Sequence, residues 1–367
     1  MSLLLPEPGA EPGAEPFVDD ETSTPFGPTA TGIGSMPGGA VLDAEADNAR
    51  AYTEAVKVVL GELGEAAHLP EMPGRGAVAD MVGRSLAVVA ELSADLQPAG
   101  WRLTGSSATS GVDQRRARSL LAQDLDTVEE HAQGYAGVFK VQVAGPWTLA
   151  ATVEKPRGDK VLSDHGARRD LAHALAEGLR DHVADVRRRV PAASRIVVQV
   201  DEPMLPAVMN ARVATASGFG KHRTVHPPEA SELLEVVLGA IGDAGAEPWV
   251  HSCAPGVDWT LVRNAGARGL MVDLAVADAA AIDHLAAHLE AGGVLGLGVV
   301  PALPPARDPG DKQLTDQVLR WLDVVGFDPG EVADQVVVAP ACGLAGAGGA
   351  WARRALTLST SVAANLR

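Results

Sequence analysis

Eight short runs rich in β-branched residues recur along the 367-residue chain, and this alternation constrains the fold more than any other feature. Segments long enough for a helix separate most runs, as at 171–189, 229–244 and 279–291. Strands that alternate with helices pair in parallel through right-handed crossovers, and eight of them predict a closed (β/α)8 TIM barrel of the α/β class. The runs are 29–37, 64–72, 138–147, 194–203, 247–255, 268–276, 292–301 and 335–343.

An open, doubly wound sheet is the alternative architecture. Such sheets often bind nucleotides through a GxGxxG or GxxxxGK[ST] loop at a helix start, and no helix of this chain opens with either motif. The glycine-rich stretch 343–349 lacks the lysine of a phosphate loop. The barrel is therefore favoured, with the long segment 74–119 expected to hold extra elements over its mouth.

The N-terminal residues 1–26 form a separate region in composition. Residues 7–16 read EPGAEPGAEP, an acidic Pro/Gly repeat without an apolar face. Such a segment cannot bury enough apolar surface to offset its ordering entropy, so a disordered tail is predicted.

Hydrophobic residues make up 46% of the chain, enough for a sizeable core. Residues 27–367 are expected to form one catalytic barrel.

The charge balance limits the class of partner. Forty-seven acidic residues against 30 Lys and Arg give a net charge of −17, which disfavours nucleic acid and anionic membranes. No apolar run approaches about 20 residues and no secretory signal pattern begins the chain, so a cytoplasmic protein is expected. Two cysteines exclude a disulfide scaffold, and a disulfide between them is not expected in that compartment.

Polar side chains collect where the predicted strands end. In a parallel barrel all strands end at one face, and that face carries the active site. Residues far apart in sequence should therefore meet there. The candidates are Ser35, Glu71, Asp201, His251, Cys253, Asp273 and Cys342.

The sharpest local feature is His251-Ser252-Cys253. Positions two apart on a strand share a face, so an imidazole and a thiol would lie side by side. With Cys342 at the last strand end they supply donors for a tetrahedral zinc site, and Asp273 could add an oxygen. Two readings remain open from spacing alone: the cysteines are small buried core residues, or a Cys/His pair acts as a nucleophile.

The carboxylates at two other strand ends also have two interpretations. Asp201 and Glu71 either cap local turns and helices or bind the ammonium group of a substrate in the barrel mouth. The turn at Ile33 and Ser35 can present backbone amides to a substrate carboxylate.

Five elements in order resemble the C-terminal catalytic barrel of cobalamin-independent methionine synthases, within the superfamily that includes uroporphyrinogen decarboxylase. TGIGSMP is similar to the family's IGS-F-P element and VAGPWTL to its GP-x-T element. VVQVDEPML is similar to Q-x-DEP-x-L. WVHSCAP and APACGLAGAGG resemble the two zinc elements, H-x-C and P-x-CG-L. The resemblance spans nearly all of the chain after the tail.

The resemblance implies a zinc-dependent S-methyltransferase that forms methionine from homocysteine. It implies His251, Cys253 and Cys342 as zinc ligands, with Asp273 at the place of a family glutamate. Ile33, Ser35, Glu71 and Asp201 match positions that hold homocysteine. No side chain is assigned as a nucleophile or general acid.

Two departures from the family concern the methyl donor. The seventh-strand element of the family contains an Asp and a His, where this chain has Pro301 and Leu303. The additional N-terminal barrel of folate-using members is not expected here. The chain resembles shorter members associated with corrinoid-protein donors, so a donor other than folate polyglutamate is expected. The alternatives are methyl transfer to another thiol or a corrinoid protein, and a non-catalytic zinc-binding barrel.

Overall fold

Eight parallel strands form the centre of the structure, a computed structural model that describes residues 26–105 and 111–367. All pairings within this sheet are parallel, in the order β1-β10-β9-β8-β7-β6-β5-β2. The predicted tail 1–26 lies outside the described residues except for Phe26. The strands are β1 (Thr29–Ala30), β2 (Ala66–His68), β5 (Val138–Ala144), β6 (Arg195–Asp201), β7 (Glu247–Ser252), β8 (Gly269–Asp273), β9 (Val294–Val300) and β10 (Val336–Pro340).

The two outer strands of this sheet, β1 and β2, meet just beyond their ends and nearly close the barrel. The Met36 amide donates to the Glu71 carbonyl at 2.7 Å, and the Glu71 amide donates to the Gly34 carbonyl at 3.0 Å. These bonds join the first two strand ends, which carry three candidate site residues. The predicted (β/α)8 barrel is confirmed, and the open-sheet alternative is wrong.

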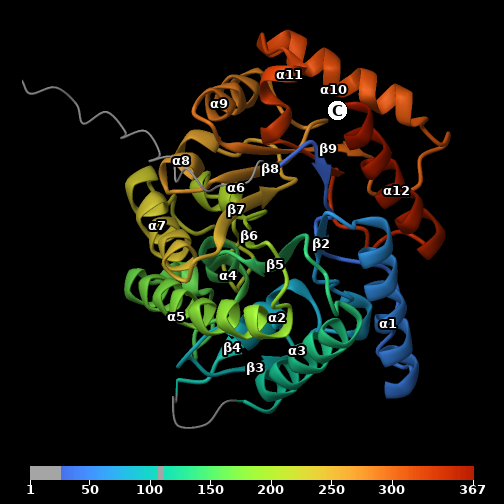
Figure 1. Cartoon of the computed structure of the whole chain (residues 1–367). Coiled ribbons are helices and arrows are strands. Elements are labelled where there is room, and N and C mark those ends of the chain that lie inside the picture. Colours follow the sequence, from blue (N-terminus) through green and yellow to red (C-terminus); the bar gives the residue numbers. More distant parts are fainter. Residues whose placement is uncertain (1–25, 106–110) are drawn as a thin grey trace, which may run out of the picture.

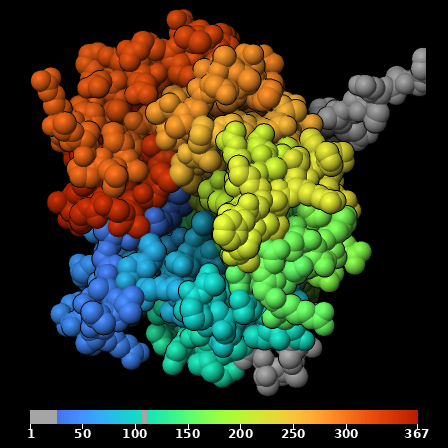
Figure 2. Space-filling model, turned by 180° about the vertical axis from the view of Figure 1, so that it is seen from behind, coloured from blue at the N-terminus to red at the C-terminus, as the bar shows by residue number. Residues whose placement is uncertain are grey.

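Helices surround the strands and cover their outer faces (Figure 1). Seen from behind, the surface follows the chain order around the molecule, as expected when each helix covers its neighbouring strand (Figure 2). No helix among the described residues is long and apolar enough to cross a bilayer. The helices are α1 (Glu45–Glu62), α2 (Met81–Val88), α3 (Val112–His131), α4 (Pro146–Thr152), α5 (His165–Arg189), α6 (Leu205–Met209), α7 (Pro227–Asp243), α8 (Trp259–Asn264), α9 (Ala279–Glu290), α10 (Asp311–Val325), α11 (Pro329–Val332) and α12 (Gly349–Asn365).

The long segment between β2 and β5 contains α2, an antiparallel hairpin and α3. The hairpin strands are β3 (Ala94–Gln97) and β4 (Gly100–Leu103). Asp80 caps α2 by accepting a hydrogen bond from the Gly83 amide at 2.7 Å. This cap starts α2 beside the barrel mouth, so the extra elements expected in this segment are present.

The barrel interior is apolar in its middle and polar toward the mouth. A small buried cluster contains Val197, Trp249, Met271 and Val337, one from each of four strands. Strand side chains alternate, so the residues two and four positions further along face the same interior. Asp201 lies four positions after Val197 on β6, and His251 lies two positions after Trp249 on β7. Both side chains therefore face the interior at the mouth.

Candidate metal and substrate site

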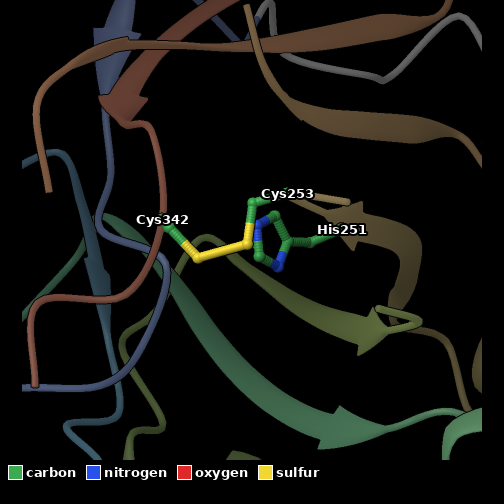
Figure 3. Close-up of side chains that lie close together, drawn as sticks. All are labelled: His251, Cys253 and Cys342. Carbon is green, nitrogen blue, oxygen red and sulfur yellow. A yellow bond between two sulfur atoms is a disulfide. The ribbon is translucent and has the colours of Figure 1, made fainter. Parts of the chain in front are cut away.

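His251, Cys253 and Cys342 meet at the mouth of the barrel. His251 lies at the end of β7, Cys253 directly follows this strand, and Cys342 follows β10. One ligand atom from each, an imidazole nitrogen and two sulfurs, lies within 4.8 Å of the others. Figure 3 shows the imidazole beside the paired sulfurs. The parallel strands thus bring together Cys253 and Cys342, which are 89 positions apart in the sequence.

Cys253 and Cys342 are joined by a disulfide in the structure, with their Cα atoms 5.9 Å apart. The sequence predicted no disulfide between these two cysteines, and the structure differs from that prediction. The physical reason is the convergence itself, because strand ends that bring two sulfurs together for a metal also bring them within bonding reach. Two linked sulfurs cannot both be thiolate ligands, so metal binding by this pair requires its reduced form.

The imidazole of His251 is held in one orientation by Asp201. Its Nδ1 lies 2.7 Å from Oδ1 of Asp201, and both side chains are buried. An ionised carboxylate only accepts hydrogen bonds, so this contact places the imidazole proton on Nδ1. The other nitrogen, Nε2, is buried without a hydrogen-bond partner. A neutral imidazole with a free Nε2 lone pair is the form that binds a metal, and a carboxylate on Nδ1 is its usual support.

A pocket of about 460 Å³ opens beside these three residues. Its wall contains seven of the eight residues singled out from the sequence, and Asp273 is the exception. The pocket has mostly apolar walls with few polar groups, which is typical of sites for small ligands. The seven residues are Ile33, Ser35, Glu71, Asp201, His251, Cys253 and Cys342.

Glu71 brings a buried carboxyl group to this pocket. Burial raises its pKa to about 7, although the nearby Arg84 guanidinium acts in the opposite direction. Arg84 Nε lies 3.5 Å from Oε1 of Glu71, and Arg84 Nη1 lies 2.6 Å from Asp124 Oδ2. Arg84 is thus shared between the carboxylates of Glu71 and Asp124. Asp124 also accepts hydrogen bonds from both terminal nitrogens of Arg75. Glu71 is therefore incompletely neutralised by the protein and suited to an added cation.

Replacing Glu71 with glutamine should stabilise the ligand-free protein at pH 8. The folded-state pKa of about 7 exceeds the ordinary 4.5, so the fold favours the neutral acid. The associated stability is complete below 4.5 and is lost as the pH rises through 7. Glutamine imitates the neutral form, so we expect a gain of about 1–3 kcal/mol at pH 8 and little change at pH 4. Thermal melting at both pH values measures this difference, and an equal shift at the two pH values would contradict it.

Asp273 lies at the end of β8 but outside the cluster of ligand atoms. Its Oδ1 accepts a hydrogen bond from the Ala275 amide at 2.9 Å. Burial raises the pKa of its carboxyl group, while the neighbouring His251 acts to lower it. Asp273 is thus close to the site, with its carboxylate engaged by its own loop.

Sequence reasoning missed the buried polar side chains behind the pocket. Lys140 on β5 and Gln199 on β6 lie in the barrel interior, 1% and 0% exposed. Gln199 stands two positions before Asp201, so strand alternation was a usable signal for it. Glu202 instead points away from the pocket and accepts hydrogen bonds from the Trp147 and Thr148 amides at the start of α4.

A comparison with known families identifies the chain. Residues 134–365 match the profile described as "Cobalamin-independent synthase, Catalytic domain". This match covers more than half of the chain and includes Asp201, His251, Cys253 and Cys342. The chain belongs to the cobalamin-independent methionine synthase family. As a member of this family it is a methyltransferase, and the resemblance noted from its motifs is confirmed.

A solved structure with low sequence identity shows the same fold. A B12-independent methionine synthase from Shewanella sp. W3-18-1, in complex with selenomethionine, is 12% identical, with a TM-score of 0.60. That match covers 92% of this chain and 97% of the Shewanella chain. GH5_18 from Streptomyces cattleya, in complex with GlcNAc, is 15% identical, with a TM-score of 0.47, covering 94% of this chain and 80% of the other. No curated protein matches this methionine synthase family member in sequence.

Proposed function

We propose that the protein is a zinc-dependent methyltransferase that transfers a methyl group to the thiol of homocysteine and forms methionine. The observation that carries this proposal is the convergence of His251, Cys253 and Cys342 beside a pocket that also contains two carboxylates. Family membership supports the methyl transfer, and the donor atoms support zinc.

The residues at the mouth fit a zinc ion. The buried Nε2 of His251 has no partner among the described residues, and two sulfurs lie within 4.8 Å. Imidazole and thiolate are the donors that zinc prefers, and catalytic zinc sites combine three protein ligands with one open position. Zinc, when bound, supplies a Lewis acid that keeps the homocysteine sulfur in its nucleophilic thiolate form. We also propose that Asp273 is an oxygen ligand at the fourth position until homocysteine takes that position, which requires its carboxylate to leave the Ala275 amide.

The remaining pocket residues suit the amino-acid end of homocysteine. Glu71 and Asp201 are buried carboxylates that would pair with the substrate ammonium, and the chain amides around Ile33 and Ser35 would bind its carboxylate. Ser35 is held in place because its Oγ accepts from the Ala345 amide at 3.4 Å. These contacts would orient the sulfur toward the cysteines and His251.

We propose that the methyl donor is a corrinoid protein rather than folate polyglutamate. Releasing a folate requires protonation of its leaving nitrogen, and a positioned acid contributes about 10²–10⁴-fold to such a step. The end of β9 offers Pro301 and Leu303, and neither side chain carries a proton to donate. A corrinoid donor needs no such acid, because the methyl group leaves the cobalt directly.

Reduced, zinc-loaded protein should form methionine from homocysteine and methylcobalamin about 10²–10⁴-fold faster than from methyltetrahydrofolate. Product analysis by mass spectrometry measures both rates, and a zinc-free preparation is the control. Equal rates would contradict the proposed donor. Absence of methionine with both donors would contradict methyl transfer to homocysteine, and zinc binding without any methyl transfer would favour a non-catalytic barrel.

A further inference from the structure

A chain of buried polar side chains crosses the barrel interior and ends at His251. Lys140 Nζ donates to Gln199 Oε1 at 2.6 Å. Gln199 Nε2 donates to Asp201 Oδ1 at 2.8 Å, and the same oxygen lies 2.7 Å from His251 Nδ1. We call these four residues, from β5, β6 and β7, the interior relay. Each member is at most 7% exposed.

The relay has only one consistent assignment of donors and acceptors. The Ile33 carbonyl and the Asp201 carboxylate only accept hydrogen bonds, so the Gln199 nitrogen must face them and its oxygen must face Lys140. The Gln199 nitrogen then faces two acceptors, Asp201 Oδ1 and the Ile33 carbonyl at 2.9 Å. Asp201 can accept from both Gln199 and His251. The direction of every bond therefore follows from the two acceptors, the Asp201 carboxylate and the Ile33 carbonyl.

The relay also reaches the turn that follows the first strand of the barrel. The Ile33 carbonyl accepts hydrogen bonds from Gln199 Nε2 and from Lys140 Nζ, the latter at 3.1 Å. Ile33 belongs to the turn whose amides we propose for the substrate carboxylate. One pair of interior side chains thus contacts both the turn and the carboxylate that orients the imidazole.

Lys140 and Gln199 lie among apolar neighbours in the barrel. Val197 and Trp249 are their register partners on the adjacent strands, and both belong to the buried apolar cluster. Burial lowers the pKa of Lys140 to about 7, and the carboxylates of Asp201 and Glu71 act to raise it. A buried lysine that carries a desolvation cost is most simply explained by the groups it contacts.

We propose that Lys140 and Gln199 are positioning residues that hold Asp201 and the Ile33 turn, so that His251 keeps its proton on Nδ1 and presents Nε2 to the metal. This proposal rests on the proposed function and deepens it. Supporting partners of metal-binding histidines typically change metal affinity about 10–100-fold when removed. Neither residue would touch the metal or the reacting sulfur.

The test compares Gln199→Leu and Lys140→Met with Gln114→Leu. Gln114 is a matched control, because it is equally buried but bonds the Ala94 amide and the carbonyls of Leu86 and Leu92, away from the site. In reduced protein we expect a 10–100-fold loss of zinc affinity in the first two variants and no loss in the control. The double variant should resemble either single variant, since the residues act through one path.

Nitrogen NMR of the histidines in metal-free, reduced protein provides a second readout. The His251 signal, assigned with a His251→Asn variant, should report the Nδ1-protonated form in the wild type and lose it in Gln199→Leu. Unchanged zinc affinity together with an unchanged tautomer would overturn the proposal. If the wild type binds no zinc, the proposed function fails, and the tautomer measurement alone still decides whether the relay orients His251.

Discussion

Replacing Cys342 with serine is expected to lower the zinc affinity of the reduced protein about 100-fold and to reduce methyl transfer at least as much. Structural zinc sites in zinc-finger peptides contribute about 10–16 kcal/mol, and on that scale one of four ligands accounts for roughly 3 kcal/mol. Every 1.4 kcal/mol is tenfold in affinity, which gives about two orders of magnitude. Competition with a chromophoric chelator measures the affinity, and metal analysis gives the content per chain.

Ser252→Ala is the matched control for that variant. Ser252 lies between His251 and Cys253, but alternation directs its side chain to the opposite face, where its Oγ accepts from the Ala254 amide at 3.2 Å. Zinc affinity should stay unchanged in this control. If Cys342→Ser retained wild-type zinc affinity, the sulfur would not be a ligand, and the two cysteines would be buried partners of each other only.

Asp201→Asn is expected to weaken both zinc binding and homocysteine binding. The loss of charge removes the ionised acceptor on His251 Nδ1, which should cost about 10–100-fold in zinc affinity. It also removes one of two carboxylates proposed for the substrate ammonium, worth about 1.5–3 kcal/mol, or roughly another 10–100-fold. The product predicts a fall in kcat/KM of about 10²–10⁴-fold. Zinc competition and calorimetry with homocysteine on zinc-saturated protein separate the two effects.

The control for Asp201→Asn is the same substitution at Asp258. That residue caps α8 through the Leu261 amide at 2.9 Å, and asparagine caps helices equally well. We expect normal zinc affinity and turnover there. Normal homocysteine affinity in Asp201→Asn would remove Asp201 from the substrate site, and normal zinc affinity would show that His251 needs no carboxylate support.

The redox state of the cysteines must be controlled in all these measurements. Cys253 and Cys342 are paired in the structure, so an oxidised sample offers zinc only His251 from the cluster. A low zinc content without a reductant therefore carries no information about ligand identity. The Cys342→Ser variant cannot form this disulfide, which makes its affinity independent of the reductant.

Much of the fold could be predicted because its signals are local. A strand buried on both faces is a continuous apolar run, and β10, with the sequence VVVAP, is buried at all five positions. Helices of the barrel carry apolar residues at helical spacing, as in α7, which begins within two residues of its predicted start. The pair His251 and Cys253 was also a local signal, since residues two positions apart at a strand end share a face whatever surrounds them.

Contacts between distant strands could not be predicted in the same way. The sequence alone determined the alternation of eight strands and helices, and with it the face on which His251, Cys253 and Cys342 end. Only the tertiary structure decided that Lys140 reaches Asp201 through Gln199, that Arg84 supports Glu71, and that the Asp273 carboxylate remains with its own loop. The reason is physical: periodicity specifies which face a side chain occupies, whereas its partner depends on strand register and barrel closure, which involve the whole chain.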